Sequence, residues 1–251
     1  MADIKSHASL TTGLVSYWDL EEASGTRYDL HGSNNLTDNN TVTSAAGKIG
    51  NAALFTSANS EYLSITDASQ TGLEPSGNMS WSFWVYFNSV PGAGSGATFL
   101  GKGDGNQKYQ IHYSGNGEGI RLLFYPSSGT YKGVDHAWTP STSTWYHIVI
   151  TFNSTASTNN FQIFINNSKT SRTGASAPCG SISGNTNPFI IGANTESPTT
   201  YFMNGRIEEV GMWGKVLSDA EVSDLYNSGN GLSYADTAGG GAVNSGFFAF
   251  M

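Results

Sequence analysis

Carboxylates are the side chains of this chain that could hydrolyse a glycosidic bond, because that reaction needs two carboxyl groups at a fixed separation. The separation is about 5–5.5 Å for retention of configuration and about 6.5–9.5 Å for inversion. Two adjacent pairs are candidates, Glu21 with Glu22 and Glu208 with Glu209. Neighbouring residues of a strand point to opposite faces, so neither pair is expected to reach one substrate. We therefore interpret the chain as non-catalytic.

Other catalytic chemistry finds no support in the spacing of the remaining residues. Glu118 has only Asp135 on the next expected segment, too little to define a pair. The five histidines and the single cysteine, Cys179, show no recognisable zinc spacing. No Gly-x-Ser-x-Gly nucleophile elbow occurs, and the glycine-rich segment 101–105 does not open a helix as a phosphate-binding loop would. His147 is expected to be part of a buried strand.

Apolar residues alternate with period two along the chain, which predicts β-strands. Any binding or catalytic residues must therefore be positioned by strands and the turns between them. Segment 81–87 places its odd-numbered residues, all large and apolar, on one face. Apolar alternation on both sides of the glycine-rich segment 114–119 predicts a hairpin, and the residues Asn166 and Asn167 predict a second one. With 31 glycines and only 12% charged residues, the chain is typical of one all-β domain with many tight turns.

One helix is expected, near the end of the chain. Segment 218–226 has helical periodicity, and Ser218 with Glu221 three residues later forms a capping-box pattern. Most of the six tryptophans are expected to be part of the core, above all Trp18, Trp84 and Trp145.

The charge pattern disfavours two classes of partner. The formal net charge is −8 and no stretch concentrates Lys and Arg, so nucleic acid is not expected to bind. No run of 18 apolar residues occurs, so membrane insertion is not expected either. The first residues lack the apolar core of a signal peptide, which leaves open a removed leader or another route out of a cell, such as release with a virus particle.

Eight segments in order carry a family resemblance. The chain resembles the laminin-G-like domains of the concanavalin A-like lectin/glucanase superfamily, between residues 14 and 226. This implies an all-β jelly-roll sandwich of two antiparallel sheets, with the first and last strands close together and one short C-terminal helix. The expected organisation is an N-terminal arm at 1–12, the domain at 13–236 and a Gly-rich linker with a Phe-rich tail at 237–251. The resembling segments are 13–25, 47–55, 80–85, 100–105, 145–152, 189–193, 204–213 and 217–226.

The resemblance also implies a possible calcium site. In many relatives the segment matching 29–35 helps to bind calcium, and the acidic pair after Ile207 is usually Asp-Asp. If the first and last strands are neighbours, four side chains could converge as Ca²⁺ ligands. The alternative is that the aspartate of this set caps a turn while one glutamate pairs with Arg27 or Arg206. The four candidate ligands are Glu22, Asp29, Asn34 and Glu208.

Glycan binding is the activity that the resemblance makes plausible. The hydrolases of the superfamily carry Glu-x-Asp-x-x-Glu on one strand, and this spacing is absent here. A sugar-binding site typically sets an exposed aromatic ring beside a few polar groups. Tyr125, Tyr131 and Trp138 are the preferred candidates for such a ring, because they cluster around a Gly/Ser-rich stretch. The wider set of aromatic candidates on expected loops and edges adds Tyr109, His136 and Tyr201.

The tail suggests an assembly role. Phe247, Phe248 and Phe250 follow a glycine-rich linker, and such apolar residues would be better placed against another subunit than in water. We expect an exposed, non-catalytic protein of a phage virion, as a head decoration, fibre or tail component, with the tail holding other subunits of a particle or a homo-oligomer. Cell-surface glycans are the second expected partner and an extracellular location the alternative to the virion surface. The alternative functions are a carbohydrate-binding module of a secreted bacterial protein and, less favoured, a glycoside hydrolase.

Overall fold

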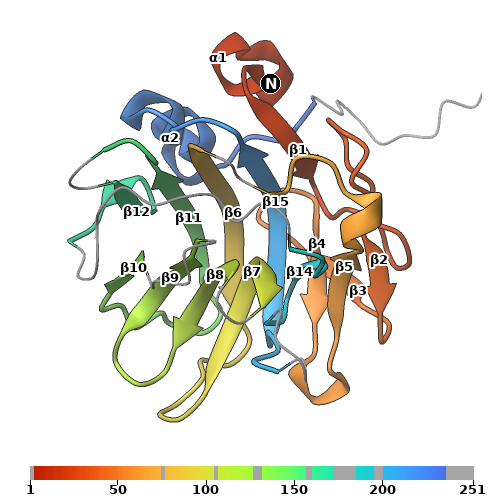
Figure 1. Cartoon of the computed structure of the whole chain (residues 1–251). Coiled ribbons are helices and arrows are strands. Elements are labelled where there is room, and N and C mark those ends of the chain that lie inside the picture. Colours follow the sequence, from red (N-terminus) through yellow and green to blue (C-terminus); the bar gives the residue numbers. More distant parts are fainter. Residues whose placement is uncertain are drawn as a thin grey trace, which may run out of the picture.

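The computed structural model describes most of the chain (Figure 1). The described residues are 3–74, 77–104, 107–126, 132–156, 160–171, 185–194 and 200–235. Tyr131, Cys179 and the expected linker and tail at 237–251 lie outside them.

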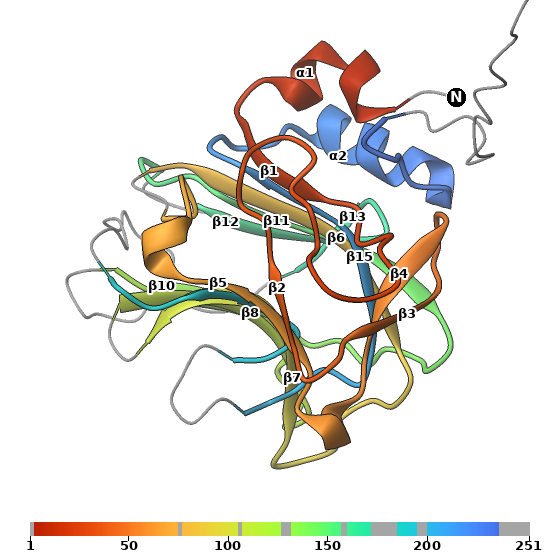
Figure 2. The same cartoon turned by 90° about the vertical axis from the view of Figure 1, so that its right-hand side faces the viewer.

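Two antiparallel sheets form the two layers of the described part (Figure 2). Strand β1 (Leu14–Trp18) lies off the main path of the eight-stranded sheet and pairs with its strand β15. The rest of that sheet runs in the order β13 (Ser168–Lys169), β12 (Phe161–Ile165), β11 (Trp145–Phe152), β6 (Met79–Phe87), β15 (Gly205–Trp213), β4 (Asn51–Phe55) and β3 (Thr43–Ala46). The seven-stranded sheet runs in the order β10 (Lys132–His136), β9 (Gly119–Tyr125), β8 (Gln107–Ser114), β7 (Gly96–Asp104), β14 (Phe189–Ile191), β5 (Tyr62–Ile65) and β2 (Thr37–Asn39).

The pairing of β1 with β15 joins the first strand to the last. Tyr17 lies opposite Gly211 and Trp18 opposite Val210 in this antiparallel pair. This confirms the expectation drawn from the family resemblance. The sandwich of two antiparallel sheets confirms the expected fold class.

The core between the sheets is built from the inward faces of the strands. On β6, Trp81, Phe83, Val85 and Phe87 are all fully buried, as their alternation predicts. Burying each large apolar side chain stabilises the fold by about 1.5–3 kcal/mol before entropy is counted. Four of the six tryptophans are buried; the two that are only partly buried are Trp138 and Trp145, of which Trp145 was expected in the core.

Predicted turns and the predicted helix are confirmed. β8 ends at Ser114 and β9 begins at Gly119, so the glycine-rich hairpin lies where alternation placed it. Asn166 and Asn167 both have the left-handed backbone that a tight hairpin requires, with φ of 51° and 63°. Helix α2 (Asp219–Tyr226) begins after the capping box of Ser218 and Glu221.

The N-terminal arm packs as part of the same body. Its described part forms the 3₁₀ turn η1 (Ile4–Ser6) and helix α1 (Ala8–Thr11), and both Ile4 and Leu10 are fully buried. Both helices lie over the outer face of the eight-stranded sheet (Figure 2). The arm therefore belongs structurally with the domain, although its sequence showed no apolar periodicity. The remaining short turns are η2 (Ser57–Asn59), η3 (Asp67–Ser69) and η4 (Asn227–Gly229).

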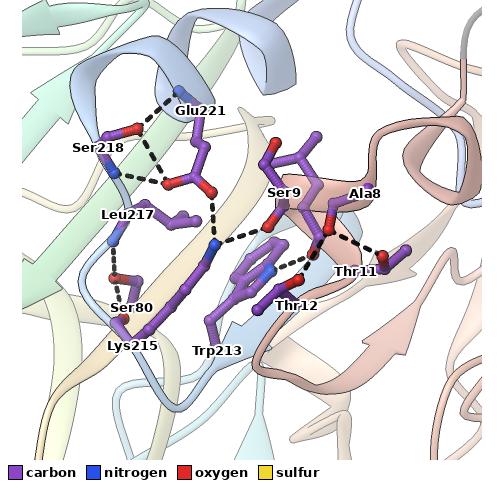
Figure 3. A network of polar contacts seen from close by, with 11 residues as sticks. Ala8, Ser9, Thr11, Thr12, Ser80, Trp213, Lys215, Leu217, Ser218 and Glu221 are labelled. Atoms are coloured by element: carbon purple, nitrogen blue, oxygen red, sulfur yellow. Dashed lines mark hydrogen bonds and ion pairs between the residues drawn. The ribbon is translucent and has the colours of Figure 1, made fainter.

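A network of polar contacts fastens the arm to the last strand and to α2 (Figure 3). Trp213 Nε1 donates to the carbonyl of Leu10 at 2.6 Å, and Lys215 Nζ donates to the carbonyl of Ser9 at 2.6 Å. Lys215 also forms an ion pair with Glu221 of the capping box. These contacts hold the helices against one sheet, and neither helix covers the outer face of the other sheet. Within the part of the chain that is described, no helix has the length and apolar character needed to cross a membrane.

Candidate functional site

The outer face of the seven-stranded sheet carries a row of polar side chains across four strands. The row consists of Thr98 on β7, His112 on β8, Arg121 on β9 and Asp135 on β10, each directly opposite the next. Residues that alternate with core residues must point away from the core, and His112 lies between the buried Ile111 and Tyr113. Gln110 and Leu123 form the next row on the same face.

A hollow of about 230 Å³ opens over these rows. Its floor comes from β8 and β9, and its rim from the loop before β7, the hairpin turn after β8, and Asn194 and Tyr201 between β14 and β15. The amide of Gly94 donates to Asn116 Oδ1 at 2.7 Å, which joins two of these rim loops. The residues that line the hollow are Gly94, Ser95, Gly96, Gln110, His112, Tyr113, Ser114, Asn116, Arg121, Leu123, Asn194 and Tyr201.

Tyr201 is the exposed aromatic residue of this rim. Its exposed fraction is 48%, although tyrosine is a large and partly apolar side chain. Its backbone is left-handed, with φ of 49°, a conformation that costs a non-glycine residue roughly 1–2 kcal/mol. A Cβ added at Gly96 would lie 3.4 Å from Cδ1 of Tyr201, so the glycine leaves room for the ring close to β7.

Hydrogen bonds hold Tyr201 in this strained position. The amide of Thr98 donates to the carbonyl of Tyr201 at 2.8 Å. One residue earlier, the amide of Thr200 donates to Asn194 Oδ1 at 2.6 Å, and Asn194 Nδ2 donates to Thr200 Oγ1 at 3.0 Å. Because strained residues persist only where the surroundings fix them, these bonds hold the backbone of Tyr201 in place at the rim.

A second hollow of about 460 Å³ is also lined by Tyr201. It shares Ser95, Gly96 and Tyr201 with the first hollow. Its other lining residues are Ser57, Ser89, Pro91, Thr200, Phe202 and Asn204. We call the two hollows together the Tyr201 groove.

His112 is a neutral imidazole at physiological pH. Burial lowers its pKa to about 4, and the positive charges of Arg121 and Lys108 lower the pKa further. Gln110 Nε2 lies 3.3 Å from His112 Nδ1, and an amide nitrogen can only donate. Nδ1 is then the acceptor, and Nε2 carries the ring proton. The imidazole is thus placed to act as a neutral hydrogen-bonding group.

The charge of Arg121 is compensated within the sheet. Its Nε donates to Asp135 Oδ1 at 2.8 Å, and its Nη1 lies 3.7 Å from Glu118 Oε1. Glu118 in turn accepts a hydrogen bond from Ser114 Oγ at 2.7 Å. The guanidinium therefore contributes fixed donors to the hollow without a large uncompensated positive charge.

Together these groups can hold a small polyhydroxylated ligand. An exposed aromatic ring offers an apolar face, and amide, hydroxyl, imidazole and guanidinium groups offer donors and acceptors around it. This combination of one apolar surface with convergent polar groups is typical of binding sites for small molecules.

The preferred aromatic candidates lie in different surroundings. Tyr125 points to the same face of β9 as Arg121 and Leu123, beyond the hollow, and Lys108 Nζ lies 5.5 Å from its ring centroid. Trp138 packs edge-on against core rings, with its centroid 6.1 Å from Phe87. Its centroid is also 6.2 Å from that of Tyr113 and 5.0 Å from that of Tyr146. Tyr131 lies outside the described residues.

Of the wider aromatic set, Tyr201 alone lines the hollows described here. Tyr109 is fully buried and donates its hydroxyl to the carbonyl of Leu73 at 3.1 Å, so it is a core residue. His136 is partly exposed at the end of β10, where its Nδ1 contacts the carbonyl of Ser171. Sequence reasoning named Tyr201 but had no means of preferring it.

The polar floor of the groove was missed, although a signal for it existed. Alternation on 109–113 and 120–124 identified the residues that face the core. The residues between them, Gln110, His112, Arg121 and Leu123, must face outward together because a hairpin aligns both strands.

Asp29 and Asn34, two of the four predicted calcium ligands, are held by hydrogen bonds of the segments around them. Asp29 Oδ1 accepts from the amides of Tyr17, His31 and Gly32, at 2.9 to 3.1 Å, and Oδ2 accepts from the amide of Asn34 at 3.0 Å. Asn34 itself bonds Ser16 Oγ and the backbone of Thr71. Asp29 thus caps its turn, as in the alternative interpretation.

The two predicted glutamate ligands are engaged elsewhere. Glu22 Oε1 accepts from the amide of Tyr28 at 2.8 Å, and its Oε2 lies 4.0 Å from Arg27 Nε. Glu208 Oε1 accepts from the amides of Lys48 and Ile49, at 2.5 and 3.2 Å. Among the described residues, no group of three or more His, Cys, Asp or Glu side chains is arranged to hold a metal ion. As placed, these residues do not fit a calcium site, and calcium binding stays a prediction.

The two adjacent glutamates of β15 correct an expectation from alternation. Ile207 and Val210 both point into the core, so two residues, Glu208 and Glu209, lie between inward positions where a regular strand has one. The register shifts there, and Glu209 has a left-handed φ of 51°. The bulge therefore brings both carboxylates to the outer side, whereas simple alternation predicted opposite sides.

Burial keeps these carboxylates from any substrate and changes their protonation. Glu208 and Glu209 are 0% and 3% exposed. Burial raises the pKa of Glu208 to about 8 and raises that of Glu209 well above its ordinary value. Tyr17 donates its hydroxyl to Glu209 Oε2 at 2.5 Å. Nearby, burial raises the pKa of Asp19 to about 6. In these positions the pair is structural and cannot reach a glycosidic bond.

His147 has the scaffold role that its strand predicted. It is 2% exposed, and its Nε2 lies 2.8 Å from Ser82 Oγ on the neighbouring strand. Burial lowers its pKa to about 3.

A comparison with protein families finds one that covers most of the chain. The laminin G model described as the concanavalin A-like lectin/glucanases superfamily matches residues 56–223. No curated protein matches the chain.

Solved structures share the fold at low sequence identity. A structure of botulinum neurotoxin type C, whose cell entry depends on interaction with two ganglioside molecules, aligns with a TM-score of 0.66 and 15% identity. That alignment covers 88% of this chain and 52% of the toxin chain. The binding domain of Paraclostridial Mosquitocidal Protein 1 aligns with a TM-score of 0.63 and 18% identity, over 87% of this chain and 52% of that one. This chain thus spans about half the length of the toxin chains that it matches.

One similar structure matches along nearly its whole length. Domain 4 of AbnA, an extracellular arabinanase from Geobacillus stearothermophilus, was solved in complex with arabinotriose. It aligns with a TM-score of 0.61 and 19% identity, over 84% of this chain and 97% of that one. At these identities the similarity establishes the fold.

Proposed function

The chain belongs to the concanavalin A-like lectin/glucanase superfamily, and on that basis we propose that it is a non-catalytic, glycan-binding jelly roll. The Tyr201 groove is the proposed binding site. The observation that carries this proposal is Tyr201 itself, 48% exposed and held in a left-handed conformation in the wall that two hollows share. Exposing an aromatic ring beside polar walls costs stability, and a sugar ring stacked on it would compensate that cost.

The floor of the first hollow supplies the polar half of the site. Gln110, His112 and Arg121 point outward from neighbouring positions of two paired strands. Sheet residues are more rigid than loop residues, so these groups keep their places before a ligand arrives. Preorganisation of this kind lowers the entropic cost of binding a flexible sugar.

The similar structures support a binding role. They include the binding domain of the mosquitocidal protein, a toxin whose cell entry depends on interaction with two ganglioside molecules, and a domain in complex with arabinotriose. The absence of a catalytic role is also part of the proposal, supported by the burial of Glu208 and Glu209 and by the ion pair that engages Asp135.

Where the protein is exposed, and what it is attached to, is a separate and more specific proposal. We propose that the protein is exposed on a phage virion or outside a cell, and that the tail at 237–251 attaches it to other subunits. The Phe-rich composition of the tail supports this attachment. The alternative setting is a carbohydrate-binding module of a secreted bacterial protein, in which the tail would have no partner.

Binding to an array of immobilised neutral and acidic glycans tests the proposed function. The wild-type protein should bind a subset of the glycans, and Tyr201→Ala should lose that binding. Tyr28→Ala is the matched control, because Tyr28 is 55% exposed but lines neither hollow. Equal binding by the wild-type and Tyr201→Ala proteins, or no binding by either, would contradict the proposal.

A further inference from the structure

Tyr201 belongs to the wall that two hollows of different size share. The first has a volume of about 230 Å³ and the second about 460 Å³, and Ser95, Gly96 and Tyr201 line both. Sites for drug-sized ligands usually enclose roughly 300–1,000 Å³. The first hollow falls below that range, and the second falls within it. The groove therefore has room for more than one sugar unit.

The backbone of the wall that the two hollows share is held on both sides of Tyr201. Thr98 anchors its carbonyl, and the mutual hydrogen bonds of Asn194 and Thr200 anchor the preceding residue. On the following side, the ring of Phe202 lies against Tyr62 with a centroid distance of 6.4 Å. A ligand that extends from one hollow into the other would contact the wall that Tyr201, Ser95 and Gly96 form.

Among the lining residues that the structure describes, the groove offers no uncompensated charge to an ionic ligand. The lining of the second hollow consists of uncharged residues, and the first contains Arg121, which is paired with Asp135 and Glu118. The imidazole of His112 is neutral in the physiological range because its burial disfavours the charged form. The net charge of −8 would moreover repel an anionic polymer.

From these observations we infer that the Tyr201 groove binds a neutral oligosaccharide of two or more units, which lies across Tyr201 with consecutive sugars in the two hollows. This inference rests on the proposed glycan-binding function and adds the length and charge of the ligand. The polar floor around Gln110 and His112 selects the sugar in the first hollow. The second hollow, with Ser89 and Asn204 at its edge, holds the neighbouring sugar.

Titration calorimetry with sugars of increasing length tests the inference. The probes are arabinose, arabinobiose and arabinotriose, the corresponding xylose and glucose series, and trigalacturonate as the acidic probe. Ser89→Trp fills the second hollow from an exposed position, and Asn88→Trp is the matched control on the neighbouring exposed residue, which lines neither hollow.

In the series that binds, the trisaccharide should bind the wild-type protein at least about tenfold more tightly than the monosaccharide. Ser89→Trp should abolish this gain while retaining the monosaccharide affinity, which also shows that the variant is folded. Asn88→Trp should keep the gain, and trigalacturonate should bind more weakly than the neutral trisaccharide.

Equal affinities for monosaccharide and trisaccharide, or a gain that survives in Ser89→Trp, would overturn the inference about length. Tighter binding of trigalacturonate would overturn the inference about charge. In both cases a loss of binding in Tyr201→Ala would leave the proposed function standing. If no series binds and the glycan array is also negative, the proposed function and this inference fail together.

Discussion

The amide of Thr98 donates a hydrogen bond to the carbonyl of Tyr201 at 2.8 Å, and this contact ties the loop after β14 to strand β7. Thr98 is fully buried, whereas Tyr201 is among the most exposed large side chains of the described residues. A rigid strand thus holds an exposed aromatic ring beside the polar face of the sheet. The first predictions below concern that ring and that face.

Replacing Tyr201 with alanine should weaken glycan binding at least about tenfold and leave stability within about 1 kcal/mol of the wild-type value. The side chain is exposed, so its removal leaves no buried cavity. The affinity is measured on the glycans that bind in the array, and the free energy of unfolding by urea denaturation. A loss of affinity accompanied by a large loss of stability would indicate a structural role instead.

Glycan affinity should be constant from about pH 6 to pH 8 and should fall as the pH approaches 4. The reason is that the pKa of His112 is lowered to about 4, so its imidazole stays neutral until that pH is reached. His112→Asn should remove this fall, because an amide does not titrate. The affinity is measured by calorimetry across the range, with circular dichroism confirming that the protein is folded. A transition near pH 6.5 would contradict the lowered pKa.

Stability should contain a contribution that decreases as the pH rises from about 4.5 to about 8. Glu208 has its pKa raised from 4.5 to about 8, so the folded state binds a proton that the unfolded state releases in this window. The contribution is fully present below pH 4.5 and is lost as the pH rises through about 8. Each such group gives a slope of up to about 1.4 kcal/mol per pH unit.

Comparison of the wild-type protein with Glu208→Gln isolates this contribution. The glutamine oxygen can still accept from the amides of Lys48 and Ile49 but cannot ionise. Urea unfolding at several pH values should give a shallower decrease for the variant between pH 4.5 and 8. Parallel curves for the two proteins would show that Glu208 does not titrate in this window.

Replacing Asp29 with alanine should lower the free energy of unfolding by about 2–4 kcal/mol in the presence of a chelator. Four backbone amides lose their carboxylate acceptor, and leaving buried donors unpaired costs about 1–3 kcal/mol each when water cannot reach them. Asp29→Asn, which keeps an acceptor oxygen, should lose less. Urea unfolding of the three proteins gives the comparison.

The same proteins test the calcium prediction. Calcium that binds the folded state raises the melting temperature by linkage. The prediction requires that added calcium raises the melting temperature of the wild-type protein and has no effect on Asp29→Ala. If the wild-type protein melts at the same temperature with calcium and with a chelator, Asp29 serves the loop alone.

Self-association should depend on the tail. The full chain should form oligomers, or bind purified particles, and a chain ending at Asp236 should do neither, because burying large apolar side chains between subunits is favourable. Light scattering after size exclusion measures the mass. A full chain with Phe247, Phe248 and Phe250 changed to serine keeps the length of the tail but removes its large apolar side chains. It therefore shows whether self-association depends on those side chains or only on the presence of the tail. Compact monomers in all three cases would remove the support for a structural subunit.

The sequence by itself determined the sandwich, the neighbouring first and last strands, both hairpins and the C-terminal helix. The hairpins and the helix follow from local rules, because alternation, turn residues and a capping box act over a few residues. The sandwich and the closeness of its first and last strands were expected from the family resemblance of eight ordered segments. Even the outward position of His112 was implied, since Ile111 and Tyr113 on either side had to face the core. The buried role of His147 was likewise readable from its strand.

Only the tertiary structure decided which aromatic residue is exposed beside the polar face. Trp138 and Tyr201 look alike in sequence, yet one packs against core rings and the other lies on a loop that a distant strand holds in place. The bulge at Glu209 shows the same limit, because the pairing of β15 with its neighbours shifts there, and two adjacent carboxylates come to share a side. Contacts between residues far apart in the chain decide such outcomes, and the pattern of one segment does not contain them.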